Sequence, residues 1–281
     1  MNEYSSDIKF AVVGAGRVGV TLGVLLKRAG HKVVGCSARS ASSLERAARW
    51  LGCPGTTAPA HAVDGADAVI VSVPDDALEA VAAKLKSTIK AGTYVIHTAG
   101  SFGVAPLSLL ADLGAITLAA HPLQSIPDVE AGVARVPGSW FGVTCSDDLK
   151  TWAGSFVESM GGRPLWIAEG DRTLYHAAAV IASNYLVVLA ALVQETGLEV
   201  GPYIPLMQGT LSNVSAMGPA IALTGPVARG DVGTVSRHLA ALPEDVRPAY
   251  RVLASAALRT ALAGGRIEKN AAAAIEKILE T

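Results

Sequence analysis

Residues 8–30 of the chain read IKFAVVGAGRVGVTLGVLLKRAG, and this stretch decides the fold. A short apolar run leads into the glycine pattern GxGxxG, and an apolar-periodic helix follows. In such a turn Gly14 allows the chain to reverse, Gly16 lets the backbone approach a pyrophosphate, and Gly19 lets the helix pack on the strand. Because a helix N-terminus also favours phosphate groups, the stretch predicts a dinucleotide-binding strand, turn and helix.

The residues after the second predicted strand, 32–36, indicate which dinucleotide is bound. An NAD-binding domain usually carries an acid here for the ribose 2′-hydroxyl, and this chain has none. Arg39, with Ser37 and Ser40 beside it, instead offers a cation and hydroxyl donors for a 2′-phosphate, which favours NADP(H). The alternative is a solvated arginine at a helix start. The expected cofactor-binding residues are Gly14, Gly16, Arg17, Val18, Gly19, Ser37, Arg39, Ser40, Val73 and Pro74.

Two histidines stand where later strands of the same sheet are expected to end. Further strands are predicted at residues 66–73, 93–97, 115–120, 139–145 and 163–167, with a helix at 147–160. His97 ends one of these strands and His121 follows another. Ligands of open α/β sheets bind outside the carboxyl ends of strands, so His97 is a candidate substrate contact and His121 a candidate catalytic residue. For each, a hydrogen-bonded turn histidine is the alternative. Asp75 and Asp76 are interpreted as helix caps.

A long apolar helix is predicted at residues 171–195. At 3.6 residues per turn, His176, Val180 and Asn184 share one stripe, and Ser183 lies beside them. We interpret the helix as buried, with the cofactor domain and a second subunit as its neighbours, because a helix that is apolar all round needs more than one. A transmembrane span is the alternative, and the interrupting histidine, serine and asparagine argue against it.

A glycine and proline loop at residues 221–231 carries two further candidate substrate contacts, Thr224 and Arg229. A guanidinium can hold a carboxylate through two hydrogen bonds, so Arg229 is expected to anchor an acidic substrate. A solvated turn ion pair is the alternative. The rest of the chain is helical by pattern at 234–240, 246–263 and 269–279, which divides it into an α/β domain at 1–169 and an all-α domain at 170–281.

Composition excludes several other classes of protein. The 23 basic and 24 acidic residues nearly cancel, and no basic run indicates nucleic-acid binding, so small molecules are the expected partners. The three cysteines, Cys36, Cys53 and Cys145, lack metal-ligand spacing, and we expect reduced thiols and no metal site. The opening ten residues lack the pattern of a signal peptide, which favours the cytoplasm and no membrane partner.

Six segments together resemble one family: GAGRVG, VSVPDDAL, VIHTAGS, AAHPLQS, LYHAAAVIASNYLVVL and ALTGPVARGD are similar to the Rossmann-like proteins that carry domain of unknown function 2520. That family is similar in architecture to the β-hydroxyacid dehydrogenases, ketopantoate reductase and pyrroline-5-carboxylate reductase. The resemblance implies an NADP-binding Rossmann domain with a mainly parallel sheet. It also implies an all-α domain like the C-terminal domain of 6-phosphogluconate dehydrogenase, which often dimerises.

The resemblance also implies roles for residues of the long helix. In the better-known relatives this helix carries a lysine and, four residues later, an asparagine, and the two orient the substrate oxygen. Asn184 matches that asparagine, Val180 stands at the lysine position, and His176, one turn earlier, is the obvious replacement acid. His121 with Pro122 is similar to a His-Pro turn beside the nicotinamide in enzymes that resemble prephenate dehydrogenase.

These observations predict an NADP-dependent oxidoreductase that reduces a small carbonyl compound, such as the 2-oxo acid ketopantoate, or an imine, in the cleft between its domains. Either His176 or His121 is expected to act as the acid, Asn184 to bond the reacting oxygen, and Arg229 to bind the carboxylate from the same or the other subunit of a homodimer. The alternative is a sensor that binds NADP(H) without turnover.

Overall fold

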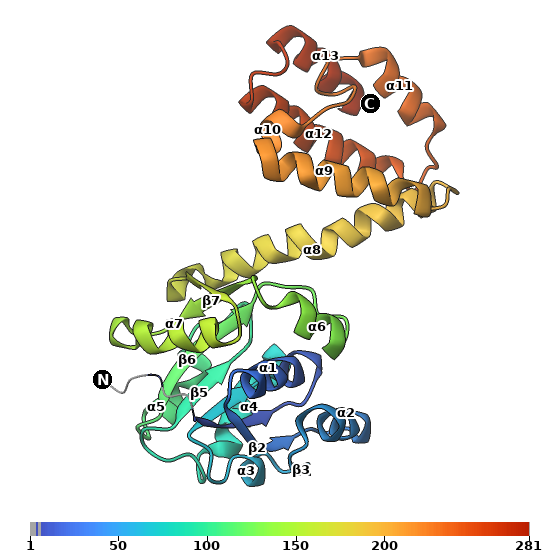
Figure 1. Cartoon of the computed structure of the whole chain (residues 1–281). Helices are drawn as coiled ribbons and strands as arrows, with labels where there is room; N and C mark the ends of the chain where they lie inside the picture. Colours follow the sequence, from blue (N-terminus) through green and yellow to red (C-terminus); the bar gives the residue numbers. More distant parts are fainter. Residues whose placement is uncertain (1–3, 5–6, 281) are drawn as a thin grey trace. The chain divides into compact units, whose positions relative to one another are not determined.

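The computed structural model describes residue 4 and residues 7–280, which form two compact units. The first unit is Met1–Ser183 and the second is Asn184–Thr281, and the division falls within the long helix α8 (Arg172–Glu195; Figure 1). The first unit extends past the expected domain boundary at residue 169. It does so because Arg172 at the start of α8 is buried against the loops that follow the strands.

The first unit is built on one eight-stranded sheet with the order β3-β2-β1-β4-β5-β6-β7-β8. The strands are β1 (Lys9–Val13), β2 (Lys32–Ser37), β3 (Gly55–Thr56), β4 (Ala68–Val71), β5 (Tyr94–His97), β6 (Ile116–Pro122), β7 (Trp140–Thr144) and β8 (Arg163–Trp166). Every neighbouring pair is parallel except β6 with β7. The predicted α/β class with a mainly parallel sheet is therefore confirmed.

The strand order reverses at β1, which pairs with β2 on one side and with β4 on the other. The chain runs outward from β1 to β3, then returns to the other side of β1 and continues from β4 to β8. At such a switch point the loops after the two central strands separate and leave room for a ligand. Here those loops are the glycine turn after β1 and the Ser72–Pro74 segment after β4.

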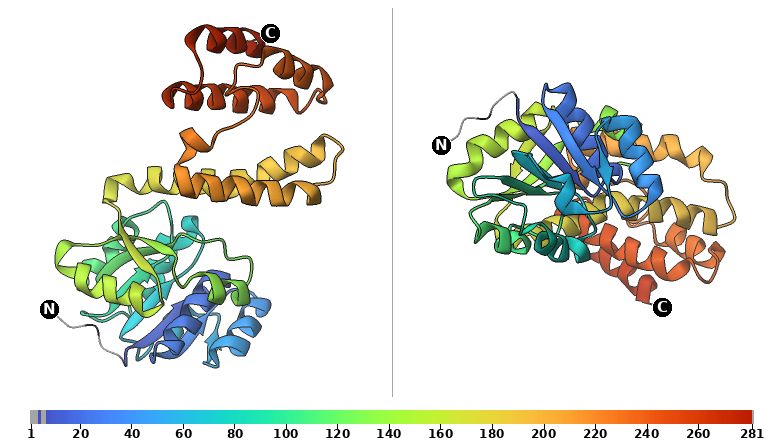
Figure 2. Two further views of the ribbon diagram at one scale, coloured as in Figure 1. Left: turned by 45° about the horizontal axis from the view of Figure 1, so that its top comes forward. Right: turned by 90° about the horizontal axis from the view of Figure 1, so that it is seen from below.

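Helices cover both faces of this sheet (Figures 1 and 2). They are α1 (Arg17–Arg28), α2 (Ala41–Leu51), α3 (Pro59–Ala62), α4 (Leu78–Leu85), α5 (Ser108–Ala111), α6 (Val129–Arg135) and α7 (Lys150–Ser159), with short 3₁₀ turns η1 (Asp75–Ala77), η2 (Ala105–Leu107), η3 (Asp147–Leu149) and η4 (Glu169–Asp171). Because both faces are covered, the strands are apolar on both sides and appear in the sequence as continuous apolar runs.

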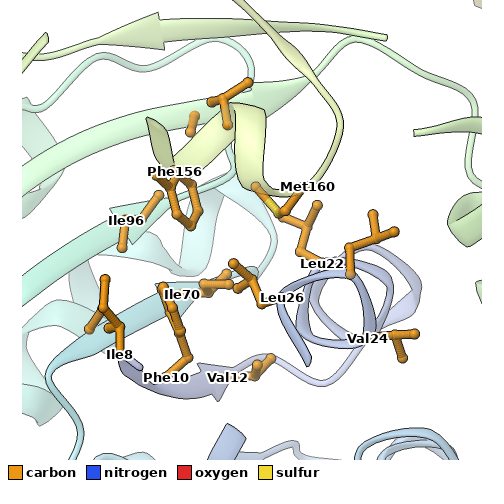
Figure 3. Packing of buried hydrophobic residues seen from close by; sticks show 14 of the residues in the cluster. Ile8, Phe10, Val12, Leu22, Val24, Leu26, Ile70, Ile96, Phe156 and Met160 are labelled. Carbon is orange, nitrogen blue, oxygen red and sulfur yellow. The ribbon is translucent and has the colours of Figure 1, made fainter. Parts of the chain in front are cut away.

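The residues of β1 alternate between two separate cores. Phe10 and Val12 pack with Leu26 of α1 and Phe156 of α7 on one face (Figure 3). Ala11 and Val13 pack on the other face in a core that includes Leu78 of α4 and Leu107. Burying this much apolar surface, at roughly 25 cal/mol per Å², fixes the register of β1 and therefore the position of the turn that follows it.

The second unit is entirely helical, as predicted. After the end of α8 come η5 (Gly201–Tyr203), α9 (Ile204–Met217), α10 (Pro219–Ala222), α11 (Val232–Ala241), α12 (Arg247–Ala263) and α13 (Lys269–Glu280). Val235, Leu258 and Ile275 lie in its buried core, which joins α11, α12 and α13. Asp231 begins α11 as its N-cap, since its side chain accepts hydrogen bonds from Thr234 N at 2.9 Å and Thr234 Oγ1 at 2.7 Å.

The burial expected for the long helix, against the cofactor domain and a second subunit, stays a prediction. In the single chain Arg172 is the only buried residue of α8, and Leu174, Ile181 and Val187 are 74%, 62% and 69% exposed. One sequence-based expectation is wrong. Asp75 and Asp76 do not cap the helix that follows; Asp75 Oδ2 instead accepts a 2.6 Å hydrogen bond from Ser101 Oγ.

The segment Glu169–Glu195 is long and apolar enough to cross a membrane, with a mean hydropathy of 1.9. One such helix is weak evidence for a span, because the core helix of a soluble protein passes the same test of length and composition. The first turn of α8 packs on the sheet, since Arg172 bonds Gly142 of β7 and Tyr175 bonds His121 of β6.

Candidate active site

The turn between β1 and α1 has the three glycine environments that dinucleotide binding requires. Gly14 has a φ of +92°, and a Cβ built there would lie 2.2 Å from the carbonyl oxygen of Ser72. A Cβ on Gly19 would lie 2.4 Å from the carbonyl oxygen of Gly14, whereas a Cβ on Gly16 would meet nothing within 4 Å. Gly14 and Gly19 are therefore required by the fold itself, and the open space is at Gly16, where a ligand can approach.

The N-terminus of α1 is free to receive an anion. Gly16 is its N-cap; no described side chain caps the helix, and its first turn holds no acidic residue. The first N–H groups of a helix lack partners within it, and the helix dipole makes that end positive. A phosphate placed over Gly16 would meet these N–H groups.

A hollow of about 420 Å³ opens beside this turn, over the ends of β1, β2 and β4. We call it the first hollow, and its lining includes seven of the predicted cofactor-binding residues: Gly14, Gly16, Ser37, Arg39, Ser40, Val73 and Pro74. Ser43 and Lys84 also line it, and the sequence did not predict them, because each lies within a helix, α2 or α4, where no motif marks it. Arg39 and Lys84 are exposed cations that form no ion pair with any residue the structure describes.

A second hollow of about 380 Å³ adjoins the first, since Gly16, Ser72 and Val73 line both. Its full lining is Gly16, Arg17, Val18, Ser72, Val73, Asp75, Thr98, Ala99, Gly100, His121, Pro122, Gln124, Ile126 and His176. Of the predicted cofactor-binding residues, Arg17 and Val18 lie here, and both predicted catalytic histidines do too. The two hollows follow one another around the glycine turn, as the two halves of a dinucleotide would.

His121 and His176 face each other across the second hollow, with ring centroids 5.5 Å apart and an angle of 85° between the rings. His121 comes from the end of β6, and His176 comes from the second turn of α8. A Cβ on Gly100 would lie only 2.1 Å from His176 Nδ1, so glycine at position 100 lets the imidazole come this close. His176 Nδ1 is buried and has no hydrogen-bond partner among the described residues.

His121 is held by Tyr175 and kept neutral by its surroundings. Its Nδ1 lies 3.0 Å from the Tyr175 hydroxyl, and the two rings meet edge to face. Burial lowers the pKa of His121 to about 4, with further lowering by His176 and by the Arg172 guanidinium. The histidine is therefore an uncharged imidazole near neutral pH.

Arg172 is the largest fully buried side chain, and the sequence reasoning did not select it. Its guanidinium donates to the carbonyl oxygens of Phe102 at 2.7 Å, Gly142 at 2.9 Å and Ala99 at 2.9 Å. These oxygens belong to the segment after β5 and to β7, so one arginine ties α8 to both. The only local signal was an arginine at the start of an otherwise apolar helix.

His97 is a hydrogen-bonded turn histidine and not the predicted substrate contact. It is fully buried, its Nε2 donates to Gly103 O at 2.6 Å, and its Nδ1 accepts from Ala99 N at 3.2 Å. Burial lowers its pKa to about 4. With both ring nitrogens occupied and no accessible surface, His97 is not placed to contact a substrate, which corrects the predicted role.

The remaining predicted site residues line neither hollow. Ser183 ends the first unit, and Asn184, Thr224 and Arg229 belong to the second unit; all four are exposed, and none lines either hollow. Among residues 7–280, Arg229 makes no ion pair with Asp231, whose carboxylate caps α11. The roles of these four residues stay predictions.

Two domain families match the chain. The Rossmann-like domain matches residues 3–122, and the domain of unknown function DUF2520 matches residues 139–257. The chain is a Rossmann-like protein with a DUF2520 domain. The resemblance seen in the sequence is thereby confirmed. No curated protein matches the chain.

Solved structures share the fold of this DUF2520 protein over nearly its whole length. A candidate NADP oxidoreductase from Bacteroides fragilis is 21% identical, with 97% of this chain and 99% of that chain covered and a TM-score of 0.74. Protein TM1727 from Thermotoga maritima is 22% identical, with 96% and 99% covered and a TM-score of 0.64. A reductive aminase from Aspergillus terreus, in complex with NADPH and ethyl-5-oxohexanoate, is 16% identical, with 98% and 93% covered and a TM-score of 0.58.

Proposed function

We propose that this protein is an NADP(H)-dependent oxidoreductase that reduces a small carbonyl compound or an imine. One observation carries the proposal: the first hollow, beside the glycine turn, adjoins a second hollow that holds two facing histidines. The first suits the adenosine and phosphate half of a dinucleotide, and the second suits its reactive end with a substrate.

The choice of NADP(H) over NAD(H) rests on charge. Arg39 and Lys84 line the first hollow as cations without ion-pair partners in the described chain, and no acid lines it. The helix α2 begins beside them, with Ser40 as its N-cap. A 2′-phosphate would gain charge-assisted hydrogen bonds here, whereas the 2′-hydroxyl of NAD(H) would find no carboxylate.

The second hollow holds side chains that can give a proton to a substrate that accepts a hydride. When bound, the reduced nicotinamide would supply that hydride. A carbonyl oxygen or imine nitrogen then gains negative charge and requires a proton, and imidazole groups are suited to both needs near neutral pH. His176 and His121 both line the hollow, which makes them the residues that serve the reacting atom.

The proposed substrate class rests on two polar side chains and on family resemblance. Arg17 and Gln124 line the second hollow and could bind a small carboxylate. A 2-oxo acid such as ketopantoate, the choice indicated by family resemblance, therefore stays the first compound to test, with fold-level analogy as its warrant. Asn184 and Arg229 are proposed as further substrate contacts, Asn184 for the reacting oxygen and Arg229 for the carboxylate.

The proposal is tested in two steps. Fluorescence titration with NADPH and NADH measures cofactor binding, and loss of NADPH absorbance is then followed across a panel of 2-oxo acids, semialdehydes and cyclic imines. Turnover of one class supports the oxidoreductase. Tight NADPH binding with no turnover across the panel would instead support the NADP(H) sensor, and absence of any dinucleotide binding would refute both.

We also propose that the chain works as a homodimer. Large apolar side chains are exposed along α8, α9 and α12, among them Leu174, Val187, Leu206 and Val252 at 67–74%. A soluble protein seldom exposes an apolar patch beyond a few hundred Å². A second copy of the chain is the occupant that a two-fold arrangement would provide.

A further inference from the structure

We infer that Tyr175 and Arg172 are positioning residues that hold His121 as a neutral Nε2–H hydrogen-bond donor, so that His121 binds the reacting oxygen and His176 gives the proton. This assignment rests on the proposed function for its chemistry. The arrangement that carries it, a buried arginine, a tyrosine and two facing histidines, belongs wholly to the first unit.

The tautomer of His121 follows from its hydrogen bond with Tyr175. Among the described residues, His121 Nδ1, 3.0 Å away, is the side-chain hydrogen-bond partner of the Tyr175 hydroxyl. A part-buried hydroxyl hydrogen needs an acceptor, so it is directed to that nitrogen. A neutral imidazole whose Nδ1 accepts carries its hydrogen on Nε2.

The position of Tyr175 is fixed in turn by Arg172. The guanidinium carbon lies 5.5 Å from the centre of the Tyr175 ring, and three carbonyl oxygens hold the guanidinium in place. Because glycine at position 142 leaves room for the end of the tyrosine ring, the phenol packs directly on β7. Arg172 thus acts on the site through Tyr175 and through its charge, without touching the hollow.

The groups around His121 disfavour a positive charge on it. Those that face it are His176, Arg172, Asp75, His97 and Tyr175. Asp75 is the single carboxylate among them, and its Oδ2 already accepts from Ser101. Burial and the neighbouring Arg172 charge hold the pKa of His121 well below its ordinary value. A neutral imidazole can still polarise an oxygen, because it donates a hydrogen bond without transferring its proton.

His176 differs from His121 in its hydrogen bonding. Its Nδ1 has no partner among the described residues, whereas Nδ1 of His121 is bonded to Tyr175, so Tyr175 fixes the tautomer of His121 alone. When bound, the reduced nicotinamide would supply a hydride to the carbonyl carbon, and the π pair of the C=O bond would move to oxygen. His176, protonated from water, would give its proton to that oxygen and return to the neutral imidazole.

Nuclear magnetic resonance of ¹⁵N-labelled histidine tests the tautomer without any substrate. His121 is assigned by the signal that disappears in His121→Gln. We expect Nε2 protonated and Nδ1 unprotonated between pH 5.5 and 8 in the unmodified protein, and a shift toward the Nδ1–H form in Tyr175→Phe. Tyr185→Phe, a change on the exposed part of α8, is the matched control and should leave the signal unchanged. An Nδ1–H form in the unmodified protein, or no change in Tyr175→Phe, overturns the positioning role.

Kinetics on the substrate found in the panel then separates the two histidines. Glutamine retains an N–H donor and cannot give up a proton, so His121→Gln should keep turnover within about tenfold. His121→Leu, which removes a donor to the developing oxyanion, should lose about a hundredfold, and so should His176→Gln, which removes the acid. If His121→Gln is as inactive as His121→Leu, the neutral-donor role is wrong. The NMR result stands even if no dinucleotide binds, so failure of the proposed function is distinguishable from failure of this inference.

Discussion

The imidazole rings of His121 and His176 meet edge to face with their centroids 5.5 Å apart, although the two residues come from a central strand and a helix of different parts of the chain. The loop after β5 makes this approach possible, since Gly100 leaves no Cβ where His176 lies. The pair lines the second hollow, so the chemistry of the proposed site depends on these two side chains.

The first prediction concerns the choice of cofactor. NADPH should bind at least about tenfold more tightly than NADH, and Arg39→Ala should erase that preference, because a charge-assisted pair contributes roughly 1.5–3 kcal/mol. Fluorescence titration with both cofactors measures it. Arg28→Ala, at the far end of α1, is the control and should keep the preference. Equal affinity of the unmodified protein for the two cofactors would sink the idea.

The second prediction separates the role of Gly16 from those of its neighbours. Gly16→Ala should leave the midpoint of thermal unfolding within about 2 °C, because its Cβ would meet no protein atom, but should weaken NADPH binding at least about tenfold by filling the space over the turn. Gly14→Ala should destabilise the fold, since it combines a φ of +92° with a clash against Ser72. Gly154→Ala in α7, which also has open space, should change neither binding nor turnover. Unchanged NADPH affinity in Gly16→Ala contradicts the pyrophosphate site.

The third prediction tests the residues assigned to catalysis on the long helix. His176→Ala and Asn184→Ala should leave NADPH affinity nearly unchanged and lower kcat by roughly a hundredfold, the scale for losing a general acid. Steady-state kinetics and cofactor titration on the same preparations measure both. If either variant instead loses cofactor binding or unfolds, that residue has a structural role.

The fold could be predicted from sequence because its signals are local. The strands are apolar on both faces, so they appear in the sequence as apolar runs. Gly14 and Gly19 of the β1–α1 turn are each needed because a Cβ would clash with backbone atoms close by, and Gly16 faces open space. The strand β3 could not be predicted, since a segment of two residues has no hydrophobic periodicity.

The candidate site could be predicted only in part, because its supporting contacts are long-range. Arg172 bonds carbonyl oxygens 30, 70 and 73 positions away, and Tyr175 reaches His121 across 54. Carbonyl oxygens leave no trace in the residue types, so nothing in the sequence marks their partner. His97 has the same strand-end position as His121 but is buried and fully bonded, a difference that depends on the loop from Gly100 to Gly103.

The fourth prediction concerns stability at mildly acid pH. His97 and His121 each have a pKa of about 4 in the folded chain, against an ordinary value of 6.5. Between these values the unfolded chain binds more protons than the folded one, so the free energy of unfolding should fall as the pH drops from 6.5 toward 4. The loss should approach about 1.4 kcal/mol per pH unit for each histidine.

Urea unfolding at several pH values between 7 and 4.5 measures this slope. His121→Gln removes one of the two groups and should make the slope shallower, whereas His61→Gln, at an exposed position of α3, should leave it unchanged. Parallel curves for His121→Gln and the unmodified protein would show that His121 does not contribute.

The last prediction is that the protein is a homodimer that covers α8. Ile181 and Val187 are 62% and 69% exposed on this helix, and keeping such side chains from water stabilises an interface by roughly 1.5–3 kcal/mol each. Light scattering at micromolar concentration should therefore report twice the chain mass. Ile181→Glu combined with Val187→Glu should give a folded monomer, because two buried charges per subunit would oppose each other across a two-fold axis. Leu113→Glu, an equally drastic change at an exposed position of the first unit, should leave the dimer intact. A monodisperse monomer of the unmodified protein would refute the dimer, and recovery of the unmodified protein only from membranes would assign the exposed face of α8 to lipid instead.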